Sequence, residues 1–483
     1  MKAINKLYFA SLILMLSTVS CNKDFLNDKP YTAVVLQDAI KTESDMLVAV
    51  TGAYAQLRNT DLYGRTLPVK GDLMGDNTYV TTGNSGRYTT LDNFNMINTD
   101  AYGLAVWQQA YVAIKYANTI IAASSSLTST TTNTSQYLGE AYAIRALMYF
   151  ELARNYGHPY TTSPNDPAVP LVLTYDQNAL PARNTVKDVY TQVIADLEKA
   201  YSLMTVYRGT AFFSKYSARA LEARVYQNMG DWANALTTAT DVITNGGFTL
   251  TPSIVSYWNS TSLQTTTKVE TMFEISSDVT YNNGFDQIGF IYIIAGGSGY
   301  ADIFATPELY SLYSATDTRK ALIVPGTRTL QTGTANYVYK YPNPANASGR
   351  DATKVIRYAD VLLIAAEAYY NKGDYTNANL YLNKVATLRD PSFAGWADTG
   401  PQVLEDILIE RRKELAFEGS RFWDLIRLQR NYTKVANVSN NVPSTTFAIT
   451  PATNTVAPNT QLIFPIPLTE LNANPNMKQN PGY

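Results

Sequence analysis

Three glutamates four residues apart are the clearest candidates for acid–base chemistry in this sequence. Glu410, Glu414 and Glu418 fall on one face of a segment that reads as helical, with Arg411 and Arg412 between them. Two carboxyl groups on opposite sides of a glycosidic bond would make a glycoside hydrolase. Carboxylates on one helix face cannot flank a substrate by themselves, and the neighbouring arginines keep them ionised. The spacing therefore favours structural ion pairs, and we expect no catalytic residue.

The single cysteine, Cys21, could carry a different reaction, the acylation of a thiol. It follows a leader with two lysines and no acidic residue, then an apolar stretch over 7–16, then small and polar residues over 17–20. This order is typical of a secretory signal, and the apolar stretch is too short to span a bilayer comfortably. A cysteine directly after the cleavage region predicts a bacterial lipoprotein whose acylated first residue is Cys21. The alternative is an incidental cysteine behind a signal that is cut elsewhere.

The sequence contains few other residues that could support catalysis or bind a metal. The chain holds one histidine, His158, so zinc, copper and iron–sulfur sites and histidine-dependent triads are disfavoured. Gly296-Gly297-Ser298-Gly299 has the spacing of neither a nucleophile elbow nor a phosphate loop, and it predicts a turn or a flexible loop. No calcium-ligand spacing stands out, so we expect no cofactor, with a structural calcium left open. With 38 basic and 40 acidic residues, the chain has no excess of positive charge that would attract nucleic acid.

Aromatic side chains are the strongest candidates for ligand binding. The chain has 36 tyrosines, while charged residues make up only 16%, against about a quarter in ordinary domains. A neutral sugar presents apolar C–H faces beside hydroxyls, so its site needs flat rings together with Asn, Asp or Arg. The candidate ligand residues in the irregular segments are Asp76, Tyr79, Arg87, Tyr88, Tyr102, Tyr281, Phe290, Tyr292 and Tyr300. The alternative for each ring is packing within its own loop.

Paired helices must position these loops. A helix-turn-helix pattern with small residues and a central Gly-Asp occurs over 218–239 and again over 363–382, a spacing that matches a tetratricopeptide-type unit. A third copy starts at Ala143, and its partner helix over 186–200 is delayed by a Pro-rich loop. Further helices are expected over 43–58, 107–125 and 403–430.

The remaining segments do not look helical. Residues 60–100 and 276–306 are rich in Gly, Asn, Thr and Tyr, and proline repeatedly interrupts 432–483. We expect functional loops or a second lobe there. We also expect a signal peptide over 1–20 and a single domain over 21–483, with an N-terminal part of about 22–230 and a C-terminal part of about 270–483. Without cysteine pairs, packing alone must hold this domain.

A series of motifs in order resembles the SusD/RagB family of surface glycan-binding lipoproteins of Bacteroidetes. The segments that carry the resemblance span the chain: Cys21-Asn22-Lys23-Asp24-Phe25-Leu26, Tyr156-Gly157-His158-Pro159, Arg357-Tyr358-Ala359-Asp360, Glu410-Arg411-Arg412-Lys413-Glu414-Leu415, Phe422-Trp423-Asp424-Leu425, Phe464-Pro465-Ile466-Pro467 and Gln479-Asn480-Pro481-Gly482-Tyr483. One departure is His158, at a loop position where the family commonly has Asp or Gly.

The resemblance implies both a fold and a role. The fold is a mainly α scaffold of about four tetratricopeptide-like helix pairs with an appended loop-rich irregular lobe. The role is non-catalytic glycan binding at the outer membrane, on the cell surface, with delivery to a SusC-like TonB-dependent transporter in polysaccharide utilisation. In the family the ligand face is built from loops in about the two regions named above. Peptide nutrients as the cargo, or less plausibly a surface glycoside hydrolase, remain alternatives.

Overall fold

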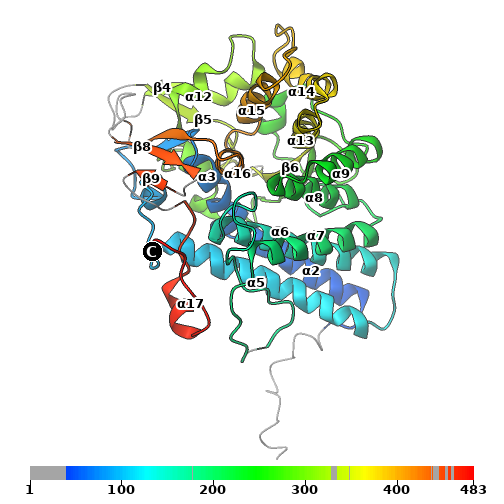
Figure 1. The fold of residues 1–483 in the computed structure, drawn as a ribbon. Coiled ribbons are helices and arrows are strands. Elements are labelled where there is room, and N and C mark those ends of the chain that lie inside the picture. Colours follow the sequence, from blue (N-terminus) through cyan, green and yellow to red (C-terminus); the bar gives the residue numbers. More distant parts are fainter. Residues whose placement is uncertain are drawn as a thin grey trace, which may run out of the picture.

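The computed structural model describes residues 40–176, 178–327, 334–347, 349–436, 438, 445–451, 455–457 and 462–483. Cys21, the leader and the first motif of the resemblance lie outside these residues. The protein is mainly α-helical, as the sequence predicts, with a helical scaffold beside a lobe of short strands and loops (Figure 1). The scaffold helices are α2 (Glu43–Leu57), α5 (Ala101–Ala123), α6 (Thr132–Tyr156), α7 (Val186–Leu203), α8 (Lys215–Met229), α9 (Trp232–Asn245), α13 (Tyr358–Asn371), α14 (Tyr375–Arg389) and α15 (Gln402–Glu414).

The two Gly-Asp motifs make the same turn between paired helices. Gly230 closes α8 in the left-handed region (φ +73°), and the side chain of Asp231 caps α9 by accepting from the Asn234 backbone N–H. Gly373 (φ +74°) and Asp374 repeat this geometry between α13 and α14. Glycine adopts this φ without a side-chain clash, and aspartate satisfies a free N–H group of the next helix. The short pattern therefore sets each helix pair locally.

Two expected helix ranges need correction. The helix expected over 107–125 starts earlier, at Ala101, because Asp100 caps it with bonds to two backbone N–H groups. The single helix expected over 403–430 is wrong: α15 ends at Glu414, and α16 (Arg421–Arg427) starts after a break. Phe417 (φ +67°) and Gly419 (φ +80°) lie in the left-handed region within this break. Because the chain turns there, Glu418 is not on the helix that carries Glu410 and Glu414.

The lobe consists of short strands and helices. Its strands are β1 (Thr78–Val80), β2 (Thr271–Ile275), β3 (Ile303–Ala305), β4 (Ile323–Thr327), β5 (Thr334–Val338), β6 (Thr353–Arg357), β7 (Tyr432–Ala436), β8 (Thr445–Thr450) and β9 (Thr455–Ala457). They pair antiparallel as β1–β3, β2–β6, β4–β5 and β7–β8–β9. The short α-helices are α3 (Thr66–Leu73), α4 (Thr89–Asp92), α10 (Ile254–Asn259), α11 (Gly289–Tyr292), α12 (Pro307–Ser311) and α17 (Leu468–Ala473).

Helix α3 lies inside a segment that the sequence predicts to be irregular. All eight of its residues are buried. Pro68 occupies its first turn, where a missing N–H group costs little. Gly71 is required by a close approach, since a Cβ there would lie 2.0 Å from the backbone oxygen of Gly419. Packing against the 415–420 break therefore holds a helix that local propensity does not favour.

Helix α3 also buries a lysine among aromatic rings. The ammonium of Lys70 lies 4.7 Å from the ring centroids of Trp423 and Phe464 and 5.3 Å from that of Phe422. Its Nζ has no hydrogen-bond partner among the described residues. Burial, helped by the nearby Arg154, lowers the pKa of Lys70 to about 7. The ring faces favour the cation but do not replace its lost hydration.

Replacing Lys70 with Met should stabilise the protein at pH 7. In wild type the unfolded chain holds the Lys70 proton up to about pH 10.5 while the folded chain loses it above about pH 7. Stability therefore rises with pH across this window, and below it the buried charge costs up to a few kcal/mol. Urea unfolding of both proteins at pH 7 and pH 9.5 checks this. The midpoint of Lys70→Met should exceed that of wild type by more at pH 7 than at pH 9.5. An equal or lower midpoint at pH 7 would contradict it.

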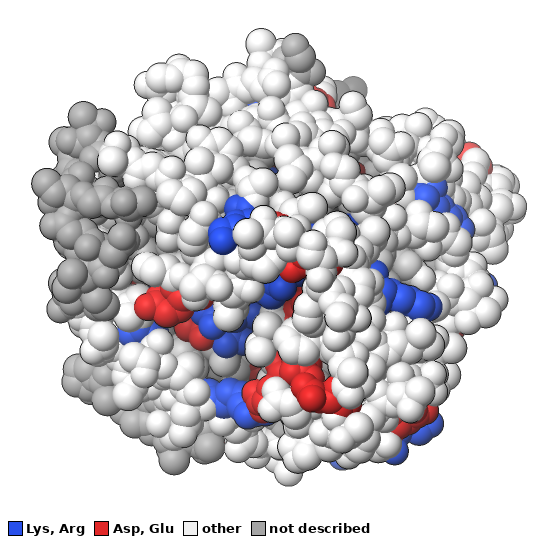
Figure 2. Space-filling model, turned by 90° about the horizontal axis from the view of Figure 1, so that it is seen from above, with Lys and Arg blue, Asp and Glu red and all other residues white. Residues whose placement is uncertain are grey.

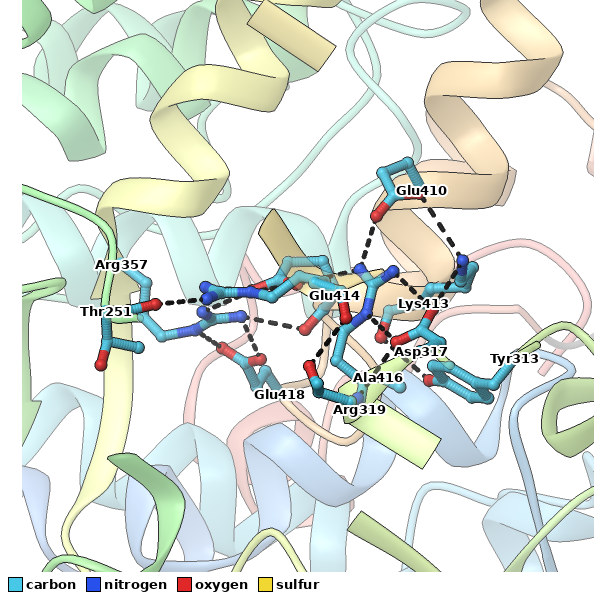
Figure 3. A network of polar contacts seen from close by, with 12 residues as sticks. Thr251, Tyr313, Asp317, Arg319, Arg357, Glu410, Lys413, Glu414, Ala416 and Glu418 are labelled. Atoms are coloured by element: carbon cyan, nitrogen blue, oxygen red, sulfur yellow. Dashed lines mark hydrogen bonds and ion pairs between the residues drawn. The ribbon is translucent and has the colours of Figure 1, made fainter. Parts of the chain in front are cut away.

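A buried ion-pair network contains the three glutamates (Figure 3). Glu414 lies between Arg357 (2.9 Å) and Arg319 (3.0 Å), and Arg389 contacts it at 3.2 Å. Burial opposes the charge, but these three arginines outweigh it and hold the pKa of Glu414 well below its usual value. Figure 3 shows Glu410 and Glu418 at either side of Glu414.

The outer two glutamates are paired as well. Glu410 contacts Arg319, and Glu418 contacts Arg357 (2.7 Å) and Lys340 (2.6 Å). All three glutamate side chains are at most 7% exposed. The structural interpretation of these carboxylates is therefore confirmed by their contacts.

Candidate functional site

The pairing of β1 with β3 brings the two irregular segments together. Tyr79 is registered opposite Phe304. Beyond the strands, the backbone N–H of Thr81 donates to the carbonyl of Asp302 (2.9 Å), and the N–H of Ser85 donates to the Asp302 carboxylate (3.0 Å). Residues 81–90 and 276–302 therefore lie side by side, and we call their exposed face the loop surface.

Arg87 and Tyr300 meet across this surface. The guanidinium carbon of Arg87 lies 3.6 Å from the centroid of the Tyr300 ring, and its Nη1 donates to the hydroxyl of Ser85 (2.9 Å). Both side chains are partly exposed. A guanidinium at this distance is attracted to the ring, while its remaining N–H groups can still donate to a ligand. The structure thus joins two of the residues predicted to bind ligand, one from each segment.

A second link runs below this contact through Arg65. Its Nη1 pairs with Asp286 (2.6 Å), and its Nε donates to the hydroxyl of Tyr88 (2.9 Å). The Tyr88 ring stacks on that of Tyr102 at 4.5 Å between centroids, and the backbone N–H of Tyr88 donates to the Tyr102 hydroxyl. Tyr102 remains half-buried at the start of α5. These contacts fix the underside of the loop surface.

The most exposed rings of the loop surface come from the second segment. Tyr281 is 64% exposed and Phe285 is 60% exposed. Phe285 contacts Phe290 (5.4 Å between centroids), and both line a hollow of about 360 Å³ together with Ser298, Pro344 and Arg350. Phe290 is itself 3% exposed, so it forms the floor of the hollow rather than its rim. Exposed rings beside an arginine are the groups that a sugar face and its hydroxyls require.

The glycine motif over 296–299 makes the turn that the sequence predicts. The backbone groups of Ala295 and Ser298 bond to each other in both directions, at 2.7 and 3.1 Å. Gly296 (φ +59°) and Gly297 (φ +76°) occupy the two central positions, where positive φ angles are needed. The turn places Ser298 on the wall of the hollow.

Three tyrosines predicted to contact ligand are in the interior, which corrects that prediction for them. Tyr79 is 3% exposed and packs edge-on against Phe304, and burial raises its pKa to about 12. Tyr88 and Tyr292 are fully buried. Tyr292 stacks beside Tyr341, 6.2 Å between centroids. Rings enclosed in this way support the loop surface from below and cannot touch a ligand on it.

Asp76 has a structural position as well. Its carboxylate pairs with Arg421 (2.6 Å) and lies 3.4 Å from Arg412. Burial opposes its charge, but the bonds and charges of these two arginines outweigh it and lower the pKa of Asp76. Asp76 therefore ties the base of the first segment to α15 and α16, which gives its carboxylate a structural role.

Sequence reasoning missed two residues that organise the surface, Arg65 and Asp302. Arg65 is 6% exposed, and Asp302 is fully buried. Asp302 bonds to Ser85, 217 residues away, and Arg65 to Asp286, 221 residues away. No local spacing marks such partners, so no pattern within either segment could have identified them.

Charge is sparse on the face of the molecule that Figure 2 shows. Most of this face is uncharged, and many of its basic and acidic side chains lie next to each other rather than in large patches of one sign. His158 is partly exposed in a loop after α6, and burial lowers its pKa. Within the described residues, no group of three or more His, Cys, Asp and Glu side chains is placed to hold a metal ion. No helix among the residues with assigned structure is long and apolar enough to cross a membrane.

Fold and surface together define a helical scaffold that carries a loop-built face, and comparisons with known proteins place it in a family. Residues 325–483 match the model of the SusD family, and residues 24–227 match a model described as starch-binding associating with outer membrane. SusD-like protein P2 of Formosa agariphila is 29% identical, with 98% of each chain covered. These matches, which lie in both halves of the chain, support a SusD-like family protein.

Solved structures agree with this assignment. A putative sugar binding protein from Bacteroides vulgatus is 28% identical, with a TM-score of 0.81 over 92% of this chain and 99% of that one. A SusD superfamily protein from Bacteroides thetaiotaomicron is 26% identical, also with a TM-score of 0.81, over 91% of this chain and all of that one. The resemblance seen in the sequence is confirmed.

Proposed function

We propose that the protein binds an oligosaccharide on the loop surface and delivers it, uncleaved, to a SusC-like TonB-dependent transporter in the outer membrane. The observation that carries the proposal is the contact of Arg87 with Tyr300, and the same segments also expose the rings of Tyr281 and Phe285. The sugar-binding description of the Bacteroides vulgatus relative and the starch-binding description of the family model support the ligand class.

Binding on this surface needs no cofactor. The apolar faces of sugar rings would pack on Tyr281, Phe285 and the open side of Tyr300, while the N–H groups of Arg87 donate to hydroxyl oxygens. Tyr102, half-buried at the start of α5, stacks on Tyr88 and accepts from its backbone N–H, which supports this arrangement from the helical scaffold. The proposed ligand is neutral, because the surface offers rings and hydrogen bonds rather than a concentration of charge.

The positions of the glutamates support a non-catalytic role. The three carboxylates considered for a hydrolase are held by arginines or a lysine in the interior. None of them belongs to the loop surface. A carboxyl group fixed in such a network is not free to exchange protons with a substrate, so the proposed role is capture and transfer.

The lipid anchor at Cys21 is part of the proposal. We expect the Cys21→Ser protein to leave the membrane fraction and appear in the soluble fraction, because the acyl chains that hold it would be missing. Detergent phase partitioning of cells expressing each form measures this. A Ser298→Ala protein, unchanged in its leader, serves as the control. Retention of Cys21→Ser in the membrane fraction would contradict the anchor.

Affinity electrophoresis tests the proposed function. The soluble protein lacking residues 1–21 is run through gels containing neutral or acidic polysaccharides, and each mixture is assayed for new reducing ends. Retardation by a neutral glycan without new reducing ends is the expected result. Release of reducing ends would favour a hydrolase, and no retardation across a broad panel would favour peptide nutrients.

A further inference from the structure

A second cavity lies away from the loop surface, between the segment 249–264 and strands β2 and β6. Its volume is about 340 Å³. Hydroxyl and amide side chains dominate its rim: Thr249, Thr251, Ser256, Ser260, Ser262 and Gln264. None of its lining residues belongs to the loop surface. Such a wall suits a ligand that both donates and accepts hydrogen bonds.

Two opposite charges face this cavity and form an ion pair without a direct hydrogen bond. Glu274 on β2 and Lys354 on β6 are cross-strand partners, and both line the cavity. The Nζ of Lys354 lies 3.9 Å from Oε2 of Glu274, beyond hydrogen-bond distance, although each side chain is only 6% exposed. In the described part of the chain, neither of these two atoms has a hydrogen bond; the other oxygen of Glu274 accepts from Thr210.

The neighbouring carboxylate shows the contrast. Glu270 lines the same cavity, but both its oxygens accept from Arg389 (2.8 Å each), and its Oε2 accepts from the backbone N–H of Thr251. The negative charge of Glu270 is therefore compensated by Arg389. Lys354 and Glu274 are the pair whose bonding capacity remains open towards the cavity. These two charged groups therefore offer free hydrogen-bonding positions to a ligand in the cavity.

A hydroxylated ring would supply that partner. A hydroxyl oxygen can accept from the ammonium of Lys354 while the same or an adjacent hydroxyl donates to Oε2 of Glu274, which bridges the 3.9 Å gap. The Lys354 ammonium is held in place over the rings of Tyr257 (4.9 Å) and Trp258 (4.7 Å). The Tyr257 hydroxyl bonds to Thr271 (2.6 Å), which fixes that ring as one wall.

We propose that this cavity is a second ligand site, which takes a single ring of a neutral sugar or a similar polyol between Lys354 and Glu274. The ligand is neutral because the two charges cancel and Glu270 is compensated by its arginine partners. The site does not depend on the proposed loop surface, and the two can be tested separately.

Fluorine NMR of protein containing 5-fluorotryptophan tests the proposal. The chain has five tryptophans, and Trp258→Phe assigns the resonance nearest the cavity. Titration with millimolar glucose, galactose, mannose and xylose should shift the Trp258 signal for at least one of them. Glu274→Gln and Lys354→Met should each weaken that sugar by about tenfold or more, because each removes a hydrogen bond to a charged group.

Further variants separate this site from folding effects and from the loop surface. Ser260→Trp fills the exposed rim and should abolish the shift without touching the interior. Lys384→Met, which removes another lysine lying over a tyrosine ring (Tyr381, 4.5 Å), should leave it unchanged, as should Tyr300→Ala. The proposal is overturned if no neutral sugar shifts the Trp258 signal, or if glucuronate alone does so and Glu274→Gln strengthens it.

Discussion

Replacing Glu414 with Gln is expected to destabilise the protein by about 3–5 kcal/mol, the range for removing one partner of a buried ion pair. Three arginines converge on this carboxylate, and its side chain is fully buried. The amide keeps the size but not the charge of Glu414, so the guanidinium groups lose the anion that compensates them. Urea unfolding measures the effect as a lower midpoint with an unchanged slope.

The same helix offers a matched control. Glu405 pairs with Arg430 at 2.6 Å, but their side chains are 46% and 39% exposed. An exposed pair of this kind contributes about 0–1 kcal/mol, so Glu405→Gln should barely move the midpoint. If both variants unfold at the same urea concentration, burial does not make the ion pairs of Glu414 more stabilising than the exposed pair.

The pH dependence of the Glu414 effect has a defined sign. The pKa of Glu414 in the folded protein is held well below its usual value of 4.5, so the folded state binds this proton less readily than the unfolded state. Its contribution to stability is therefore complete above the unfolded pKa and is lost as pH falls through the folded one. The difference between wild type and Glu414→Gln should be constant from pH 7 to about pH 5 and should narrow at lower pH.

Replacing Tyr300 with Ala is expected to weaken glycan binding by about 30-fold, which corresponds to about 2 kcal/mol, the range for a central aromatic contact. The change removes a ring face for the sugar and also the surface on which the Arg87 guanidinium rests, 3.6 Å from the ring centroid. One substitution would therefore affect both groups proposed to contact the ligand, the Tyr300 ring and the Arg87 guanidinium. Retardation in affinity gels, or calorimetry with the glycan identified there, measures the loss.

A tyrosine of the same kind elsewhere provides the control. Tyr175 is 61% exposed, and the ammonium of Lys115 lies 5.1 Å from its ring centroid, on a different part of the molecule. Tyr175→Ala removes a ring with a cationic partner but should leave glycan affinity unchanged. Equal losses in the two variants, or full affinity in Tyr300→Ala, would contradict the assignment of the loop surface.

Local patterns predicted the scaffold because its determinants are local. In α8–α9 and α13–α14 the Gly-Asp turn, the cap and the small residues all lie within about one helix turn of the positions they control. The family resemblance also followed from contiguous motifs. Helix α3 could not be predicted in this way, because its stability comes from the close approach of Gly71 to Gly419, far along the chain.

The site was predictable by region but not by residue. Both irregular segments do meet, and Arg87 with Tyr300 lies at their contact. Rings alone do not reveal which side of a loop faces water, so buried Tyr79 and Tyr292 looked the same in sequence as exposed Tyr281. Their burial depends on Phe304 and Tyr341, residues whose positions only the tertiary structure defines.

The pairing of β1 with β3 also has a kinetic consequence. It joins Ser85 to Asp302 across 217 residues, and the base of the same segment is held by Arg421, 345 residues from Asp76. Contacts of such high sequence separation form slowly, because a long loop must close before they are gained. During folding, helix content should therefore appear before ligand binding does. The loop surface would be among the last features of the chain to form, and it would depend on segments from both ends.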